Sequence, residues 1–172
     1  GSTAITVSST NNITGVVTFT ASTANNTVTV TDTTAQTISF GSGNDTITTG
    51  VVASSTQTIN GGAGNDTMTA GIITTAGVLQ LNGDAGNDII TVAAMTGATT
   101  ASSATINGGT GVDFITLDAN AGNTVDVVST ATTLADADKI TGFTTTVDDF
   151  DYDGALVNDT ATTITAVSNA TL

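Results

Sequence analysis

The chain has 172 residues, enough for one domain with its own core. It carries 15 acidic residues against one basic residue, which gives a formal net charge of −14 at pH 7. This charge excludes nucleic acid as a natural partner and disfavours anionic membrane surfaces, because phosphate groups are recognised by clustered Lys and Arg. No apolar stretch is long enough to span a bilayer. The natural counter-charge for this chain is a cation.

The composition predicts an all-β protein. The sequence contains 42 Thr and 19 Gly but no Pro, Cys, His or Trp, and every acidic residue is Asp. Thr and Val favour pleated, half-buried strands, whereas Gly, Asn and Asp favour turns. Ala is frequent, but it stands among Thr and Gly rather than on apolar faces with the period of a helix.

Residues 1–35 contain a weak copy of a pattern that becomes clear further along the chain. The segment ANNTVTV at 24–30 alternates polar and apolar residues, as a strand with one buried face does. It places Asn26 at 19 residues before Asp45, the first aspartate of the clear repeats. We therefore expect degenerate coils in this region.

Four clear copies follow between residues 36 and 116. They read QTISFGSGNDTIT (36–48), QTINGGAGNDTMT (57–69), LQLNGDAGNDIIT (79–91) and ATINGGTGVDFIT (104–116). A large apolar residue precedes each glycine turn and another follows it: Ile38, Ile59, Leu81 and Ile106 before, and Ile47, Met68, Ile90 and Ile115 after. So short a unit cannot bury its apolar face alone. Stacked copies make a continuous core, which predicts a parallel β-solenoid.

The pattern weakens again after residue 116. ADKIT at 137–141 places Asp138 at 25 residues after Asp113, and NDTAT at 158–162 places Asp159 at 21 residues after Asp138. With one coil per repeat, the chain predicts a single domain over residues 1–172, with about eight rungs of 19–25 residues. Residues 36–116 form its regular part, and residues 117–172 supply degenerate rungs and a possible cap.

The four turns follow the pattern G-G-x-G-x-D-x-U-x, where U is a large apolar residue. Residues 61–69 and 108–116 match at every position, residues 83–91 have Asp84 for the second glycine, and residues 40–48 have Phe40 for the first. Glycine lets the backbone adopt positive φ and point carbonyl groups into one concavity. Calcium takes six to eight oxygen ligands from carboxylates and backbone carbonyls. The pattern therefore predicts a calcium site.

This nonapeptide resembles that of the RTX (repeats-in-toxin) calcium-binding family. The resemblance implies a right-handed parallel β-roll, with ions held between the turns of successive rungs. Because the turn occurs once per rung here, we expect Ca²⁺ along one edge only, in about three shared sites. The expected ligands are the carboxylates of Asp45, Asp66, Asp88 and Asp113 and the carbonyls of Gly41, Gly43, Gly61, Ala63, Gly83, Ala85, Gly108 and Thr110. Further candidates for metal binding are Asp84 and Asp138.

A second acidic stretch, DDFDYDGALVND at 148–159, follows the D-x-D-x-D-G pattern of an EF-hand loop through Asp149, Asp151 and Asp153. Thr160 stands where that loop requires a bidentate Glu. Either this segment binds a further calcium, or Phe150 and Tyr152 face inward from an ordinary strand. The pattern favours the strand.

These features predict a non-enzymatic, calcium-binding structural module of a secreted bacterial cell-surface protein. The composition resembles RTX-bearing S-layer proteins, which implies type I secretion, folding on extracellular Ca²⁺, and further domains or copies of the same protein as partners. The alternative is the carboxy-terminal calcium module of a type I-secreted enzyme, or of an adhesin that binds ice or another ligand through columns of Thr. Without His or Cys, no serine has a base to activate it, which argues against an enzyme.

Overall fold

A computed structural model describes residues 3–7, 15–18, 23–31, 33–93, 102–118, 124–129 and 138–142. Every regular element in these ranges is a β-strand, as the composition predicted. None of them is a helix long and apolar enough to cross a membrane. The predicted loop at Asp149, Asp151 and Asp153, the weak repeat at Asp159 and the possible cap lie outside the described residues.

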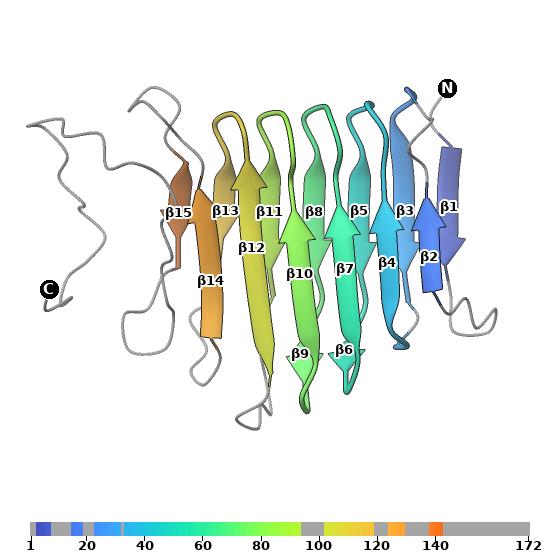
Figure 1. Cartoon of the computed structure of the whole chain (residues 1–172), viewed down its shortest axis with the longest axis vertical. Coiled ribbons are helices and arrows are strands. Elements are labelled where there is room, and N and C mark those ends of the chain that lie inside the picture. The colour runs from blue at the N-terminus through green and yellow to red at the C-terminus, as the bar shows by residue number, and fades with distance from the viewer. Residues whose placement is uncertain are drawn as a thin grey trace, which may run out of the picture.

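The strands form two large parallel sheets and one small one (Figure 1). The seven-stranded sheet has the order β1 (Thr3–Val7), β3 (Asn26–Val30), β5 (Thr46–Thr49), β8 (Thr67–Ala70), β11 (Ile89–Val92), β13 (Phe114–Thr116) and β15 (Lys139–Thr141). The six-stranded sheet has the order β14 (Thr124–Ser129), β12 (Ser103–Gly109), β10 (Val78–Asn82), β7 (Thr56–Asn60), β4 (Gln36–Ser39) and β2 (Gly15–Thr18). The small sheet pairs β6 (Val52–Ala53) with β9 (Ile73–Thr74).

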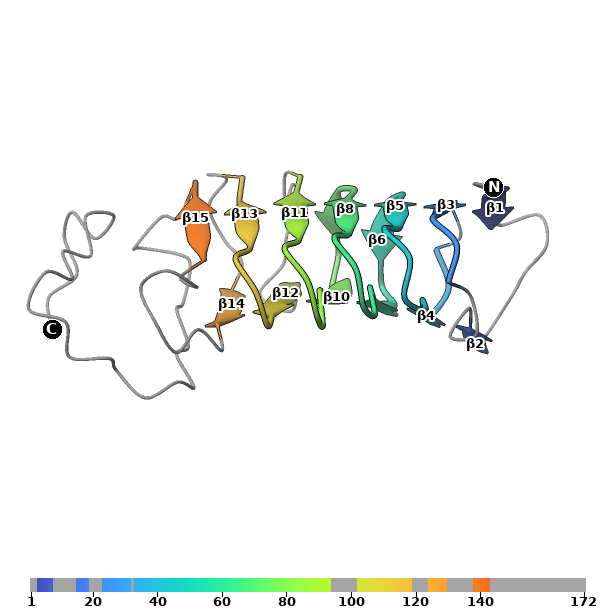
Figure 2. The same ribbon diagram turned by 90° about the horizontal axis from the view of Figure 1, so that it is seen from above.

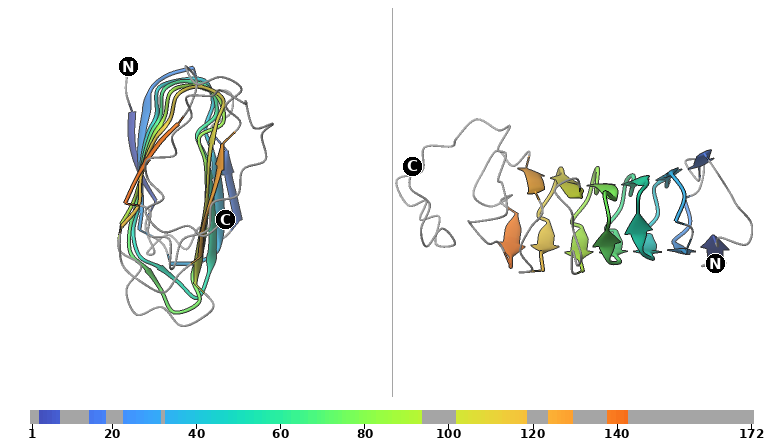
Figure 3. Two further views of the ribbon diagram at one scale, coloured as in Figure 1. Left: turned by 90° about the vertical axis from the view of Figure 1, so that its left-hand side faces the viewer. Right: turned by 90° about the horizontal axis from the view of Figure 1, so that it is seen from below.

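Each coil of the chain takes one strand from each large sheet. In Figure 1 the chain rises along the near sheet, crosses a glycine turn at the top and descends along the far sheet while it advances from right to left. This path is a right-handed coil. Figure 2 shows the two sheets as separate rows, and the end-on view of Figure 3 shows the coils nested as flattened loops. The predicted parallel β-solenoid is therefore confirmed.

The strand register reproduces the spacing of the sequence repeat. Thr46 pairs with Thr27 of the preceding coil and with Thr67 of the following one, at separations of 19 and 21 residues. Four units have both strands and their turn described, at residues 36–49, 56–70, 78–92 and 103–116. An eighth rung would require Asp159 and its neighbours, which the described ranges do not include.

The core lies between the two large sheets and is built from two columns of like residues. The columns are Ile38, Ile59, Leu81 and Ile106 on one sheet, and Val28, Ile47, Met68, Ile90 and Ile115 on the other, all of them buried. The segments between the repeats turn at the opposite edge, where Val52 and Ile73 close the core. Because every rung places its apolar residues at the same height, each side chain packs on its equivalents above and below.

We expect Ile59→Ala to lower the free energy of unfolding by about 2–5 kcal/mol, because Ile59 is fully buried in the middle of its column and truncation leaves a cavity. Thr48→Ala, on the exposed face of β5, is the matched control and should cost less than about 1 kcal/mol. Urea denaturation of both variants in excess calcium measures the difference. Equal costs would contradict this account of the core.

Candidate metal centre

Three of the four turns, at 61–66, 83–88 and 108–113, have a shared backbone conformation that ordinary residues adopt only with strain. At the second position of the nonapeptide, φ is +95° in Gly62 and +97° in Gly109. At the fourth position φ is also positive, in Gly64, Gly86 and Gly111. Asp84 has a φ of +69° at the second position of its turn, the conformation that glycine occupies in the turns on either side. The shape of these three turns therefore favours glycine at the second and fourth positions of the motif.

Backbone hydrogen bonds stack these turns on one another. Ala85 donates its N–H to the Gly62 carbonyl at 2.8 Å, and Gly64 donates to the Ala85 carbonyl at 2.8 Å. Thr110 and Gly86 repeat the arrangement one coil further on, toward the carbonyls of Asp84 and Thr110, at 2.8 and 2.9 Å. We refer to the spaces between turns 40–45 and 61–66, 61–66 and 83–88, and 83–88 and 108–113 as the first, second and third gaps.

The predicted aspartates form a single column along this edge, joined by hydrogen bonds from coil to coil. The Oδ1 atom of Asp66 accepts the backbone N–H of Asp45 at 2.7 Å, and Oδ1 of Asp88 accepts that of Asp66 at 2.7 Å. Asp113 and Asp138 continue the series, accepting from Asp88 at 2.8 Å and from Asp113 at 3.0 Å. The repeat at Asp138 therefore belongs to the same column as the clear copies.

The second oxygen of each buried carboxylate has no protein partner. The Oδ2 atoms of Asp45, Asp66, Asp88 and Asp113 are buried and accept no hydrogen bond. A buried acceptor left unsatisfied costs about 1–3 kcal/mol, and more when it is charged. Four repetitions of this cost at equivalent positions indicate a missing cationic partner.

Glycine lets the carboxylate lie in a space beside its turn that a Cβ atom would otherwise fill. A Cβ atom built on Gly61 would collide with Oδ2 of Asp66, and one built on Gly83 would collide with Oδ2 of Asp88 and with the Gly108 carbonyl oxygen. Oδ2 of Asp113 lies in the same way against Gly108. We call this space, bounded by an Oδ2 atom and the first glycine of the turn, the cradle. In the turn of Gly83 it also brings a backbone carbonyl beside the carboxylate.

The donor set suits a hard cation. Among the described residues no three acidic side chains converge on one point. A cation in a gap would therefore combine one or two carboxylates with backbone carbonyls, and calcium accepts this mixture in its shell of six to eight oxygens. When bound, the ion compensates the carboxylate charge and links successive turns.

While no cation is present, burial disfavours the ionised form of these carboxylates. Removal from water raises the pKa of Asp66 to about 6 and that of Asp88 to about 7. Burial likewise raises the pKa of Asp113 to about 6. The hydrogen bonds from the backbone lower these values, but repulsion between neighbouring carboxylates raises them again. The charged form of the column is thus electrostatically unfavourable.

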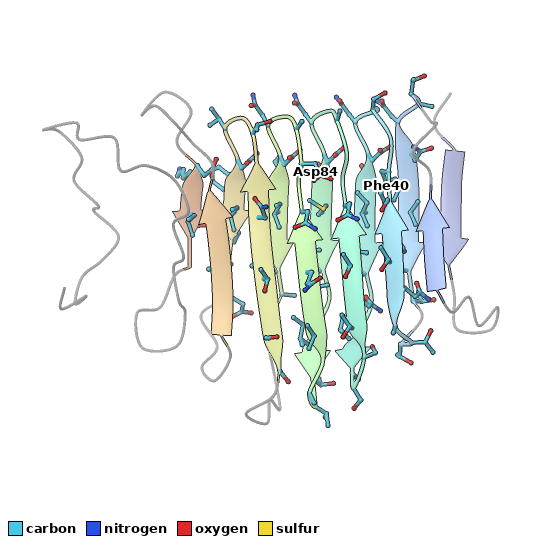
Figure 4. All side chains as sticks on the ribbon, viewed as in Figure 1. Phe40 and Asp84 are labelled. Atoms are coloured by element: carbon cyan, nitrogen blue, oxygen red, sulfur yellow. The ribbon has the colours of Figure 1, made fainter. Side chains whose placement is uncertain are left out.

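The other predicted ligands are mostly backbone carbonyls, some of which accept hydrogen bonds from adjacent turns while others lie beside the cradles. The carbonyls of Gly41, Ala85 and Thr110 accept backbone N–H groups from adjacent turns, at 2.7–2.9 Å. Those of Gly83 and Gly108 lie close to the cradles of Gly61 and Gly83. Asp84 is exposed, outside the buried column, and its Oδ2 accepts the N–H of Gly62 at 3.2 Å (Figure 4). Gly43 is the fourth residue of its nonapeptide and Ala63 is the third residue of its own, and both lie on the same edge.

A second ladder on this edge escaped the sequence analysis. Asn44 Oδ1 accepts the backbone N–H of Asn65 at 3.0 Å, and Asn65 Oδ1 accepts that of Asn87 at 2.9 Å. Asn25 and Val112 stand at its two ends. The signal was the Asn directly before Asp in three of the four clear repeats, which a pattern written with x at that position hides.

The comparisons with known proteins agree with this geometry. The family model of the RTX calcium-binding nonapeptide repeat (4 copies) matches residues 56–72 and 80–93, which contain the turns on either side of the second gap. These segments are similar to RTX repeats, and the match supports a calcium-binding module. No curated protein and no solved structure matched the chain.

Without divalent cations we expect the protein to be more stable at about pH 5 than at about pH 8. The carboxyls of Asp66, Asp88 and Asp113 have a pKa of about 6–7 when folded, against 3.8 for an unperturbed Asp. Between these values the folded state binds more protons than the unfolded state, so stability falls as pH rises. Saturating calcium should remove or reverse this trend, because it replaces the protons.

Melting temperatures from circular dichroism, at both pH values and with either chelator or calcium, measure the effect. A melting temperature in chelator that rises between the lower and the higher pH would contradict the inferred cost of the charged column.

Proposed function

We propose that this chain is a calcium-stapled structural module. The observation that carries the proposal is the column of buried Oδ2 atoms without partners, of which those of Asp66, Asp88 and Asp113 lie in cradles that only glycine leaves open. A turn needs neither a stacked column of like charges nor a space beside each carboxylate. Ca²⁺ supplies the charge and the coordination that this arrangement lacks.

Calcium would act by completing the fold. Neighbouring strands of a sheet are about 4.8 Å apart, so successive carboxylates repel one another within the Debye length of about 8–10 Å. Each ion that binds the folded form but not the unfolded chain adds about 2.7 kcal/mol when its concentration is a hundredfold above its Kd. Two or three such ions contribute as much as the whole stability of a small domain.

The proposal extends to the cellular setting. A site that folds the chain at the affinities of extracellular calcium modules, about 10⁻⁴–10⁻³ M, suits a protein exported unfolded and folded outside the cell. The composition, rich in Thr, Ala, Gly, Asn and Asp with a single Lys, supports a secreted bacterial surface protein of the S-layer type. Its partners would be calcium ions and further domains or copies of the same protein, without nucleic acid or membrane insertion.

No chemistry is assigned to the module itself. The sequence has no His or Cys to act as base or nucleophile. The buried aspartates are engaged in the column, where Oδ1 holds the next coil. We therefore propose a non-enzymatic role, either in a lattice or as the calcium module of a secreted enzyme encoded in the same polypeptide.

The outer face of the seven-stranded sheet supports a ligand-binding adhesin as the second candidate. It carries a column of Thr in register: Thr29, Thr48, Thr69, Thr91, Thr116 and Thr141. The neighbouring column begins with Thr27, Thr46 and Thr67 but continues with Ile89 and Phe114, which are exposed. Lys139 then lies 4.8 Å from the Phe114 ring centroid. Two adjacent Thr columns thus run side by side only from β3 to β8, and a thermal hysteresis measurement tests ice binding there.

Calcium titration is the direct test of the proposed function. We expect the chelated protein to be loosely folded near neutral pH, and to gain the circular dichroism of a β-sheet cooperatively at about 10⁻⁴–10⁻³ M Ca²⁺. Mg²⁺ at the same concentration is the control, since it demands a smaller octahedral shell and should act weakly. An identical spectrum and melting temperature with and without calcium would refute the proposal.

Asp84→Gly separates the cost of the turn from the affinity for calcium. Glycine fits a positive φ, and the change removes a charge that raises the pKa of both Asp66 and Asp88, so the metal-free form should gain about 1 kcal/mol. The same loss of charge should weaken calcium binding. Urea denaturation in chelator and calorimetric titration measure the two effects. Equal changes of the same sign would contradict a contribution of Asp84 to the ion-binding edge.

A further inference from the structure

Phe40 stands at the position that glycine occupies in the other three clear turns. Its backbone N–H donates to the Asn60 carbonyl at 3.0 Å, just as Gly61 donates to Asn82 and Gly83 donates to Asn107, both at 2.8 Å. Figure 4 shows Phe40 at the end of β4, beside the same edge as Asp84. The register therefore makes Phe40 the equivalent of the residue that forms the floor of each cradle.

The side chain of Phe40 fills the space that glycine leaves open. In the glycine turns, the Oδ2 atom of the aspartate lies where a Cβ of the first residue would be. Phe40 has that Cβ and an aromatic ring, and it is 3% exposed and packed in the hydrophobic core. The carboxylate of Asp45 consequently cannot lie against the first residue of its turn as those of Asp66, Asp88 and Asp113 do, although its Oδ2 is likewise buried without a hydrogen bond.

The backbone of the first turn differs as well. Neither Gly41 nor Gly43 has a positive φ, although the second and fourth positions of the next three turns all do. Isolated parallel bridges join Ala63 to Ala85 and Ala85 to Thr110, and within the described part of the chain no such bridge extends back to Ser42. The first turn is therefore stacked on the next one less regularly than the other three are stacked on one another, although the Gly41 carbonyl still accepts the N–H of Ala63 at 2.7 Å.

Asp45 has a structural partner in the preceding coil. Its Oδ1 accepts both the backbone N–H of Asn26 at 2.6 Å and the side-chain Nδ2 of Asn26 at 2.8 Å. Asn26 thus ends the column with a neutral amide at the place where an aspartate would otherwise stand. Asp45 would keep this role without any ion.

We propose that Phe40 closes the first gap, so that the row of calcium ions begins at the second gap and Asp45 serves as a structural cap. This inference rests on the proposed calcium-binding function. A hydrocarbon wall supplies no oxygen ligand, and a divalent cation beside it would lose hydration without replacement. The chain consequently holds one ion fewer than its four clear nonapeptides suggest.

The test compares two isosteric substitutions in the full chain. Asp45→Asn preserves the Oδ1 acceptor for Asn26 and should bind the same number of Ca²⁺ ions as the wild-type protein. Asp66→Asn should lose at least one ion. Native mass spectrometry gives the count, and calorimetric titration gives the stoichiometry independently. Loss of an ion in Asp45→Asn would overturn the proposal.

Phe40→Gly tests the blocking residue itself. It should bind one ion more than the wild-type protein, because glycine opens the cradle. Phe40→Ala is the matched control: it removes the ring but keeps the Cβ, so its count should stay unchanged. A folded Phe40→Gly protein with no additional ion would overturn the role of Phe40. If the wild-type protein bound no calcium at all, the proposed function would fail first, which is a distinct result.

Discussion

The hydrogen bond from the backbone N–H of one aspartate to the carboxylate of the next is the interaction on which this edge of the solenoid depends. It joins Asp45, Asp66, Asp88, Asp113 and Asp138 in one column. A strand that slipped by one residue would turn its apolar side chains to solvent, so the register of the core and that of the column must agree. In Asp66, Asp88 and Asp113, the Oδ1 atom accepts the hydrogen bond that fixes the register, and the Oδ2 atom of the same carboxylate lies in the cradle. The register of the coils and the proposed metal site therefore depend on the same side chain.

This double use creates an energetic conflict that a bound cation would resolve. Burial and mutual repulsion raise the pKa of the central aspartates, which means that the ionised column opposes folding. The hydrophobic columns and the neutral Asn ladder favour folding, and their contributions do not depend on calcium. A divalent ion bound beside the carboxylates would offset the unfavourable charges and link the coils. Under the proposed function, the balance between these terms would make folding depend on the calcium concentration.

Two residues that depart from the repeat make the gaps along the edge differ from one another. Phe40 brings hydrocarbon to the first turn, whereas Asp84 brings an additional charge to the second gap. The opposite edge carries no aspartate column in the described coils; Val52 and Ile73 close it with apolar contacts. Because the aspartate column runs along one edge only, the connecting segments at the other edge can differ in length, and the repeat spacings of 19–25 residues show this variation.

Much of this architecture was predictable because a solenoid repeats one strand–turn–strand unit. The spacing of Asp45, Asp66, Asp88 and Asp113, with an apolar residue on each side of every turn, determined the strands, the buried columns and the shared edge. The sequence alone could not assign the two oxygens of each carboxylate to different partners, nor show that Asn44 and Asn65 form a ladder, since these depend on distances between coils. It also could not tell that Phe40 points inward against the cradle. Those features were decided by the tertiary structure, because the space beside a turn is set by the coil stacked on it.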